Sequence, residues 1–456
     1  MVNKFFFFYE VILILLCIFF PLILGFNLVS LSFFINSLAI SFFLFRIFFV
    51  NKNESLPISA MVTFYYFFYI IAPVLQINAS SLRAVNTVQI NDSLIVQANI
   101  IIFLFLILFL IFYEMLKPIF LTKKPNLIID PKFEFYLRRI FIILSGIISV
   151  YAIIHLTSIF FGSTKNLEDS NNLLTLIRGK VIFMLPFLTI GIVLLTPKIY
   201  VKNYLWILVF LIICLIITKN PILDRRNALG PVYLSLIFLF LIRNNLFKRN
   251  YFFHITFFSL GLLFPMSALL THYVLYEDRK IFFTQILFDH FYGLHYDAWS
   301  SIIATIEYVN TFGIQLGNQL LGTVLFYVPR IFWETKPSST ATEVGNYLMD
   351  SSSLWFNNIS ISLPAEGFID FGYLGLVIMA FLLALFVLWI EYLSLSPNKT
   401  HKIASIFLSL QMIFILRGSL LPAFAYTIGA LITLLAIPIF TLKIILFLKR
   451  STRSLH

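Results

Sequence analysis

Long apolar runs are the feature that most constrains what this chain can fold into. Runs of about 20 residues, each enough to cross a bilayer as a helix, recur along the whole sequence. Of the 456 residues, 60% are hydrophobic and only 11% are charged. A chain of this composition has too little polar surface to form a soluble domain. We therefore predict an all-α, polytopic membrane protein.

The runs predict about twelve transmembrane helices. The first, in KFFFFYEVILILLCIFF, lacks a small-residue cleavage site and continues too long for a signal peptide, so we expect an anchor helix. Cys17 and Cys214 each fall inside a run, and we expect two buried thiols without a disulfide. The predicted spans are residues 5–25, 28–50, 57–77, 94–114, 139–161, 179–197, 203–218, 228–243, 251–272, 366–392, 402–417 and 423–447.

The distribution of charge predicts the orientation of these spans. With the N-terminus in the cytoplasm, 20 of the 32 lysines and arginines lie on the inner side, as the positive-inside rule requires. Most acidic residues then lie on the outer side. Both termini are expected to be cytoplasmic. The formal charge of +12 is explained by this topology without a nucleic-acid partner.

One outer segment is large enough to build a site. We divide the chain into a transmembrane region at 1–272, a large outer loop at 273–365 and a second transmembrane region at 366–456. Long connections of this kind are usually functional. Within the loop, GNQLLGTVLFYVPRIFW (317–333) predicts a helix that lies in or dips into the outer interface.

Two cations in this loop lie beside an interfacial aromatic residue. Arg330 and Lys336 flank Trp333 in LFYVPRIFWETKP, and a proline comes directly before Arg330 and directly after Lys336. They could be anchors whose charged ends reach the headgroups. They could equally bind a lipid-linked phosphate or diphosphate, because the guanidinium fork of arginine suits phosphate oxygens.

Further outer cations favour the phosphate hypothesis. Arg225 and Arg226 are adjacent in the short segment DRRN between two spans, although Arg226 could simply pair with Asp224. Arg417 ends a predicted span and is followed by a glycine. An arginine at a membrane edge is a functional candidate because burying its charge is costly.

Candidate proton-transfer groups lie in FDHFYGLHYDAWSS (288–301). If this segment is helical, His290 and Asp297 share a face and His295 points elsewhere. Either residue could instead be structural, His290 as a hydrogen-bonded histidine and Asp297 as a surface carboxylate. Tyr296 and Trp299 offer aromatic faces for stacking on sugars. The spacing matches no standard metal site, so no metal is predicted.

A second acidic pair precedes the tenth predicted span. Glu366 and Asp370 in ISLPAEGFIDFGYLG are four residues apart and share a helix face. Carboxylates at a membrane edge are functional candidates by default. The alternative is that Glu366 forms a structural ion pair with one of the outer arginines.

Several of these segments resemble one family. GNQLLGTVLFYVPRIFWETKP is similar to a block of the form Gly-x-Gln-Leu-Leu followed by Val-Pro-Arg-x-x-Trp-x-x-Lys-Pro. HYDAWSS resembles a Gly-Tyr-Asp-Ala segment with His295 in place of the glycine, and NNISISLPAEGFIDFGYLG resembles a block ending in Glu-x-Tyr-x-Asn-Phe-Gly. RGSLL resembles an Arg-Gly-Asp-Leu motif with Ser419 in place of the acid. The family is that of the bacterial O-antigen polymerases, called Wzy.

The resemblance implies a GT-C-like glycosyltransferase of the bacterial inner membrane that acts on the periplasmic side. It would join oligosaccharide repeat units carried on undecaprenyl diphosphate, without metal or cofactor and beside a separate chain-length regulator. The residues that we assign to these roles are Asp297, Glu366 and His290 for catalysis, Arg225, Arg226, Arg330, Lys336 and Arg417 for the diphosphate, and Tyr296, Trp299 and Trp333 for the substrate.

Three alternatives remain open from the sequence. An O-antigen ligase would use the same lipid-linked glycan and a similar arrangement of spans. A lipid-linked oligosaccharide flippase or other transporter would place charges along a path in mid-membrane, whereas most charges here lie at span ends. A structural or partner-binding membrane protein would not explain the clustered outer arginines.

Overall fold

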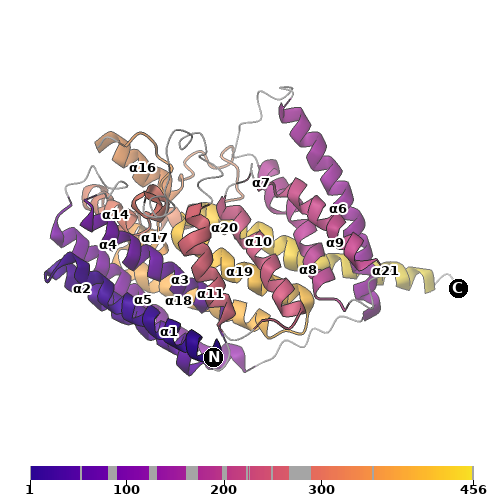
Figure 1. The fold of residues 1–456 in the computed structure, drawn as a ribbon. Coiled ribbons are helices and arrows are strands. Elements are labelled where there is room, and N and C mark those ends of the chain that lie inside the picture. The colour runs from indigo at the N-terminus through magenta and orange to yellow at the C-terminus, as the bar shows by residue number, and fades with distance from the viewer. Residues whose placement is uncertain are drawn as a thin grey trace. The chain divides into compact units, whose positions relative to one another are not determined.

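The computed structural model consists of helices joined by loops (Figure 1). Arg225 and the first part of the predicted outer loop, 273–288, lie outside the residues that the structure describes. The described residues are 2–51, 54–80, 90–122, 131–160, 173–197, 203–221, 224, 226–247, 250–266, 289–351 and 354–453.

Membrane-length helices confirm the predicted class of protein. Among the described residues, nine helices are long and apolar enough to cross a membrane. Three shorter apolar helices complete the series, and the twelve segments lie at the twelve predicted positions. The nine are Phe6–Leu24, Leu28–Val50, Leu56–Asn78, Asp92–Leu121, Glu134–His155, Ile177–Leu194, Tyr373–Ser394, Lys399–Arg417 and Leu420–Phe447; the shorter three are Tyr204–Thr218, Ala228–Arg243 and Tyr251–Met266.

The chain forms two compact units. Unit 1 comprises Met1–Leu121, Arg249–Trp389 and Met412–Phe424, and unit 2 comprises Thr122–Lys248, Ile390–Gln411 and Ala425–His456. These units are defined by packing, whereas the predicted division into spans and an outer loop is one of membrane topology. The predicted division stays a prediction. Cys17 in unit 1 and Cys214 in unit 2 are both free and buried, as predicted.

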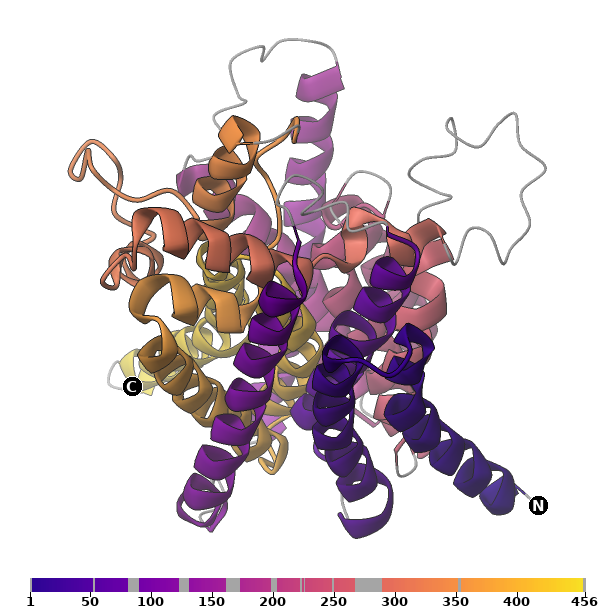
Figure 2. The same ribbon diagram turned by 90° about the vertical axis from the view of Figure 1, so that its left-hand side faces the viewer.

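Unit 1 holds the long N-terminal helices and the described part of the predicted outer loop. Helix α2 packs against α1 and α5, and α14 packs against α5, α16 and α17. Figures 1 and 2 show α14, α16 and α17 at one end of the long helices α2 and α5. The helices that lie entirely in unit 1 are α1 (Val2–Phe19), η1 (Phe20–Leu24), α2 (Leu28–Phe45), η2 (Arg46–Val50), α3 (Leu56–Tyr65), η3 (Tyr66–Ile71), α4 (Ala72–Asn78), α5 (Asp92–Leu121), α11 (Tyr251–Phe258), η7 (Ser259–Leu263), η9 (Leu294–Tyr296), α14 (Ser300–Phe312), α15 (Asn318–Val324), α16 (Thr340–Ser351) and α17 (Leu363–Phe371).

The predicted tenth span, 366–392, is two helices. α17 ends at Gly372, whose φ of 59° lies in the left-handed region, and α18 (Tyr373–Ser394) begins directly after it. Only glycine adopts that conformation without strain. The two helices touch at Gly367 and Gly375, because a Cβ on Gly375 would lie 1.8 Å from the Gly367 carbonyl oxygen. This elbow places α17 outside the candidate membrane span.

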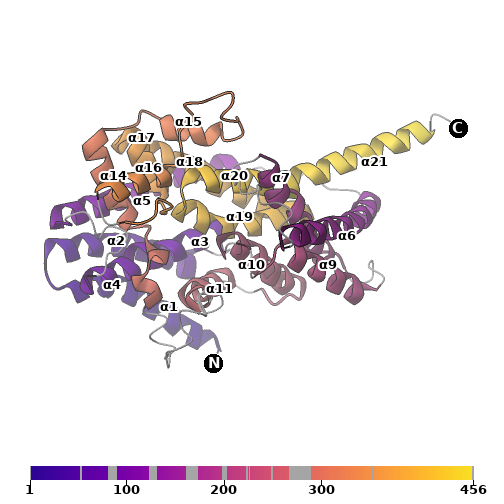
Figure 3. The ribbon, with the colours of Figure 1, turned by 90° about the horizontal axis from the view of Figure 1, so that it is seen from above.

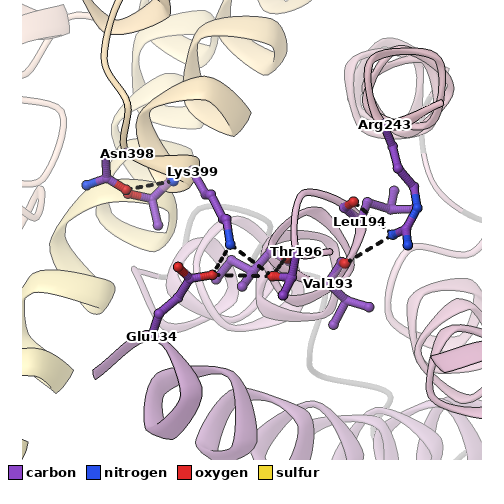
Figure 4. Close-up of polar contacts among 9 residues, drawn as sticks. Glu134, Val193, Leu194, Thr196, Arg243, Asn398 and Lys399 are labelled. Atoms are coloured by element: carbon purple, nitrogen blue, oxygen red, sulfur yellow. Dashed lines mark hydrogen bonds and ion pairs between the residues drawn. The ribbon is translucent and has the colours of Figure 1, made fainter. Parts of the chain in front are cut away.

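Unit 2 is held together by cations at the end of α8 (Leu185–Leu194). Arg243 donates to the carbonyl oxygens of Val193 (3.3 Å) and Leu194 (2.8 Å), the last residues of α8 (Figure 4). Lys399 bridges Glu134 and Thr196 beside them. The Arg243 bonds satisfy carbonyls that a helix leaves unpaired at its C-terminus. We therefore regard this cluster as structural.

The other helices of unit 2 complete its apolar core. α8 packs against α6, α9 and α10. Three of the five boundaries between the units fall within α18, α19 and α20. The remaining helices are α6 (Pro131–Phe160), α7 (Leu173–Lys180), η5 (Ile182–Met184), α9 (Tyr204–Thr218), α10 (Arg226–Arg243), α19 (Lys399–Arg417), α20 (Leu420–Leu431), η10 (Ile432–Ala436) and α21 (Ile437–Arg453).

Candidate functional site

Asp297 is a buried carboxylate just before α14. Its side chain accepts hydrogen bonds from the Ser360 hydroxyl and from the Arg417 guanidinium, with 3.2 Å between Arg417 Nη2 and Asp297 Oδ1. The Asp297 side chain is 6% exposed. A buried carboxylate needs such a partner, because an unpaired charge is costly in a low-dielectric surrounding. The buried Asp297 carboxylate is therefore paired with the guanidinium of Arg417.

The segment around Asp297 is not the continuous helix that its spacing suggested. Gly293 interrupts it, and a short 3₁₀ turn, η9, precedes Asp297. His290 and Asp297 therefore do not share the face of one helix. Instead the His290 and His295 rings stack with centroids 4.4 Å apart, so the prediction that His295 points elsewhere is wrong. Both rings also contact Phe264.

Arg417 reaches Asp297 from the last residue of α19. Its side chain is 23% exposed, so the guanidinium is paired but still accessible. It also lies 5.8 Å from the centroid of the Phe68 ring, a distance at which a cation is attracted to the face of an aromatic ring. Gly418 follows at once and its N–H bonds to the Phe414 carbonyl, which ends the helix.

Glu366 is a second buried carboxylate, on α17, and its partners are all uncharged within the described part of the chain. It accepts hydrogen bonds from the hydroxyls of Thr340 and Ser419 (2.8 Å from Ser419) and from the backbone N–H of Leu420 (2.7 Å). Burial raises the pKa of Glu366 to about 7; the three donors lower it and the nearby Asp370 raises it. Among the arginines with described side chains none forms an ion pair with Glu366, and Arg417 pairs with Asp297 instead.

Asp370 lies one turn further along α17 and has a structural role. Its carboxylate accepts the backbone N–H groups of Gln319 (3.1 Å) and Leu320 (2.8 Å) at the start of α15. Burial raises the pKa of Asp370, and these backbone donors lower it. Glu366 and Asp370 share a helix, as predicted, but Asp370 fastens α15 to α17.

One short run joins the two buried carboxylates. Arg417 binds Asp297 and Ser419, two residues later, binds Glu366. We call Asp297, Glu366, Arg417 and their hydroxyl partners the two-carboxylate site. The sequence predicted the two acids and the arginine. It missed three hydroxyl residues, Thr340, Ser360 and Ser419; only Ser419 carried a signal, because it directly follows the Arg417–Gly418 pair.

Two of the predicted sugar-stacking residues lie in the core beside this site. Tyr296 and Trp299 are both 0% exposed. The Tyr296 hydroxyl donates to the Leu260 carbonyl (2.7 Å) and Trp299 Nε1 donates to Asn99 Oδ1 (2.9 Å). Because their faces are covered and their polar atoms are paired within the protein, we assign both rings to support of the site. Trp333, the third residue assigned to the substrate, is half-buried.

The segment after α15 is a loop rather than the predicted interfacial helix. α15 ends at Val324, and residues 325–337, which we call the strap, run through successive turns (Figure 3). The Lys336 ammonium donates to the carbonyl oxygens of Phe326 (2.7 Å) and Val328 (2.9 Å). Pro329 lacks the N–H that a continuing helix needs, and Lys336 supplies donors for carbonyls that would otherwise pair along a helix.

Two of the predicted diphosphate ligands therefore lie close together on the strap. Arg330 Nη1 donates to the Lys336 carbonyl (2.8 Å), and the Arg330 side chain is exposed. Burial, and then the charge of Arg330, lower the pKa of Lys336.

Arg417, a third predicted diphosphate ligand, belongs to the two-carboxylate site, and the side chains of the remaining two are not described. Arg225 lies outside the described residues, and Arg226, in unit 2, begins α10 with a side chain that is not described. Asp224, the possible partner of Arg226, lies near Lys219 and Lys180, whose charges lower its pKa against the larger effect of burial, which raises it.

Comparison with known proteins adds no relative. No protein-family model, curated protein or solved structure matches the chain. The fold and the two-carboxylate site are therefore the observations from which a function can be argued.

Proposed function

We propose that this chain is a membrane glycosyltransferase that polymerises oligosaccharide repeat units carried on a polyprenyl diphosphate. The observation that supports this most is the contrast between two buried carboxylates joined through Arg417 and Ser419. One is paired with an arginine, and the other is held by neutral donors with a pKa of about 7. Such a contrast between neighbouring acids is typical of sites that divide charge stabilisation from proton transfer.

The proposed reaction transfers the growing glycan to a fresh repeat unit. A hydroxyl of the acceptor sugar attacks the anomeric carbon of the donor, and the bond from that carbon to the diphosphate oxygen breaks. The electron pair leaves with the lipid diphosphate, and the acceptor proton is taken by a base. Glu366 suits this role because a base works best when its pKa lies near the operating pH.

Cations in unit 1 would stabilise the departing diphosphate. Arg417 is 23% exposed, and its guanidinium is bound to Asp297 through Nη2. Charge that develops on a leaving group is best stabilised by donors already fixed in place, and Asp297 fixes Arg417. Arg330 and Lys336 would add charge from the strap. Asp297, neutralised by its arginine, is the weaker candidate for the base.

The strap would control access to Glu366. Thr340, which follows the strap after two residues, hydrogen-bonds to Glu366, and the carboxylate is only 2% exposed. Binding of an acceptor sugar would therefore require Thr340 to move away. A covered site also limits hydrolysis of the glycan by water. On this proposal the site faces the periplasm, both termini are cytoplasmic and the chain lies in a bacterial inner membrane beside a chain-length regulator.

Deletion and complementation test the proposal. We expect a deletion strain to lose the ladder of surface-glycan lengths and to keep single repeat units on the lipopolysaccharide core. The wild-type gene should restore the ladder and Glu366→Gln should not. If the deletion removes single units as well and leaves the polymer on its lipid carrier, the chain is a ligase. Unchanged banding would exclude both enzymes.

A further inference from the structure

The strap exposes large apolar side chains outside every candidate membrane span. Ile331 is 86% exposed, Phe332 83% and Tyr327 56%. The preceding residues Leu316 and Val324 add to this surface, with exposures of 77% and 51%. Exposed apolar surface of this extent on a loop usually marks an interaction site.

The strap and the segment before it contact residues near the starts of two membrane spans. Ten residues before the strap, Gln315 N–H bonds to the carbonyl of Ile369 (2.8 Å) on α17, just before the span that begins at Tyr373. At the start of the strap, the Phe326 ring lies 6.0 Å from that of Phe424, one turn inside the span that begins at Leu420. The exposed apolar side chains of the strap therefore extend from positions at the edge of the bilayer.

Several backbone groups of the strap form hydrogen bonds within the protein, as an environment with little water requires. Carbonyl groups that enter the bilayer boundary must be paired within the protein. Lys336 pairs with those of Phe326 and Val328, and Phe332 N–H and Trp333 N–H bond to the carbonyls of Pro329 and Arg330. Part of the polar backbone of the strap is therefore paired within the protein, while Tyr327, Ile331 and Phe332 are exposed.

The positive charge of the strap also favours contact with a lipid bilayer. Arg330 lies next to Ile331 and Phe332 and its side chain is exposed. A cation beside apolar anchors suits the phosphate layer of a bilayer, where its charge meets phosphate oxygens and the neighbouring rings meet acyl chains.

We propose that the strap is a membrane-inserted loop. Tyr327, Ile331 and Phe332 enter the boundary between headgroups and acyl chains in the leaflet where the spans from Tyr373 and Leu420 begin, and Arg330 binds a lipid phosphate there. The proposal goes beyond the enzymatic one and does not depend on it. If the chain catalyses no transfer, the position of the strap is unaffected.

Site-specific fluorescence in vesicles tests this insertion. Single cysteines at Ile331 and, as a matched control, at the exposed residue Asp350 on α16 would be introduced into the full chain with Cys17→Ala and Cys214→Ala. Each would carry an environment-sensitive dye, and the protein would be reconstituted in phosphatidylcholine and phosphatidylglycerol vesicles. Nitroxide-labelled lipid and aqueous iodide would serve as quenchers.

The two labels should respond in opposite ways. We expect lipid nitroxide to quench the dye at 331 several-fold more than the dye at 350, and iodide to do the reverse. Phe332→Asp should make the dye at 331 accessible to iodide without changing the melting temperature, because Phe332 is 83% exposed. Equal iodide quenching at both positions would overturn the proposal. The proposal would also be overturned if the dye at 331 were shielded from both quenchers, but only at high protein-to-lipid ratios. That result would indicate that a second copy of the chain covers the strap.

Discussion

Arg417 donates a hydrogen bond of 3.2 Å to Asp297, a residue 120 positions earlier in the chain. Two residues later, Ser419 donates one of 2.8 Å to Glu366. A turn at the end of a membrane helix thereby holds two acids from different parts of unit 1. One acid is neutralised by a charge and the other is left to neutral donors, and this difference underlies the predictions below.

Replacing Glu366 with Gln should remove transfer without removing the fold. Gln keeps the size of the side chain but takes up no proton, and loss of a general base commonly lowers the rate by about 100-fold or more. We expect normal amounts of Glu366→Gln protein in membranes and no polymer ladder. A ladder of wild-type length would exclude Glu366 as the base.

The pH dependence of transfer should follow the donors around Glu366. Its carboxylate form is the active base, so the rate should rise with pH through about 7. Thr340→Val and Ser419→Ala each remove a hydrogen bond to the charged form, which raises the pKa and moves this rise to higher pH. Ser419→Asp should move it further because it adds a like charge.

The control for this series is Thr311→Val, which removes an exposed hydroxyl bonded to the Glu307 carbonyl. Its pH profile should match that of the wild type. In the described structure few titratable groups face Glu366. The charge of Asp370, on the same helix, is the one that acts on the pKa of Glu366. Profiles that coincide for Thr340→Val, Ser419→Ala and wild type would contradict the proposed role of these donors.

A double-mutant cycle separates structure from chemistry at Arg417. Arg417→Ala should lower the free energy of unfolding by about 1–3 kcal/mol, because it leaves the Asp297 carboxylate buried without its cation. Adding Asp297→Asn should restore much of that stability. Transfer should stay lost in the double variant because no guanidinium faces the diphosphate. Recovery of activity together with stability would show that the pair is only structural.

The strap cations should be needed for polymer formation. Arg330→Ala removes an exposed charge and its hydrogen bond to the Lys336 carbonyl, and we expect single capped units without polymer. Lys336→Met should act alike, by loosening the strap where Lys336 holds two carbonyls. Lys402→Ala changes an exposed lysine of unit 2 and is the charge-matched control. Full-length polymer from Arg330→Ala would remove Arg330 from the mechanism.

The elbow between α17 and α18 should tolerate no side chain. Gly375→Ala would place a Cβ 1.8 Å from the Gly367 carbonyl oxygen and force the helices apart. We expect a large fall in folded protein, measured by thermal unfolding in detergent. Gly230→Ala is the control, because nothing lies within 4 Å of its Cβ position, and an alanine in a helix is favoured over glycine by about 1 kcal/mol. Equal melting temperatures would contradict the close approach.

The sequence predicted the membrane helices well because a bilayer imposes a length. An apolar run either spans about 30 Å of hydrocarbon or does not, so the positions of the nine membrane-length helices and the three shorter apolar ones in the described residues could be read from hydropathy alone. Hydropathy carries no information on backbone dihedral angles. The break at Gly372 inside the predicted span 366–392 depends on a left-handed φ, and the apolar run continues across it.

The site was predictable in its charges but not in its pairing. Asp297, Glu366 and Arg417 stand out because only 11% of the residues are charged. Which acid binds the arginine depends on how segments 120 positions apart fold together. Thr340 and Ser360 gave no signal, because hydroxyl residues are common in loops. Tyr296 and Trp299 misled, since an aromatic residue at the surface and one in the core look alike in sequence.

Transfer by the purified chain tests the central claim most directly. The protein would be reconstituted in vesicles with repeat units on undecaprenyl diphosphate, and glycan length and released undecaprenyl diphosphate would be measured together. Our account predicts that the wild type forms a ladder and releases one lipid diphosphate per bond, while Glu366→Gln does neither. Wild-type protein that is folded yet releases no lipid diphosphate, or a Glu366→Gln variant that matches it, would contradict the account.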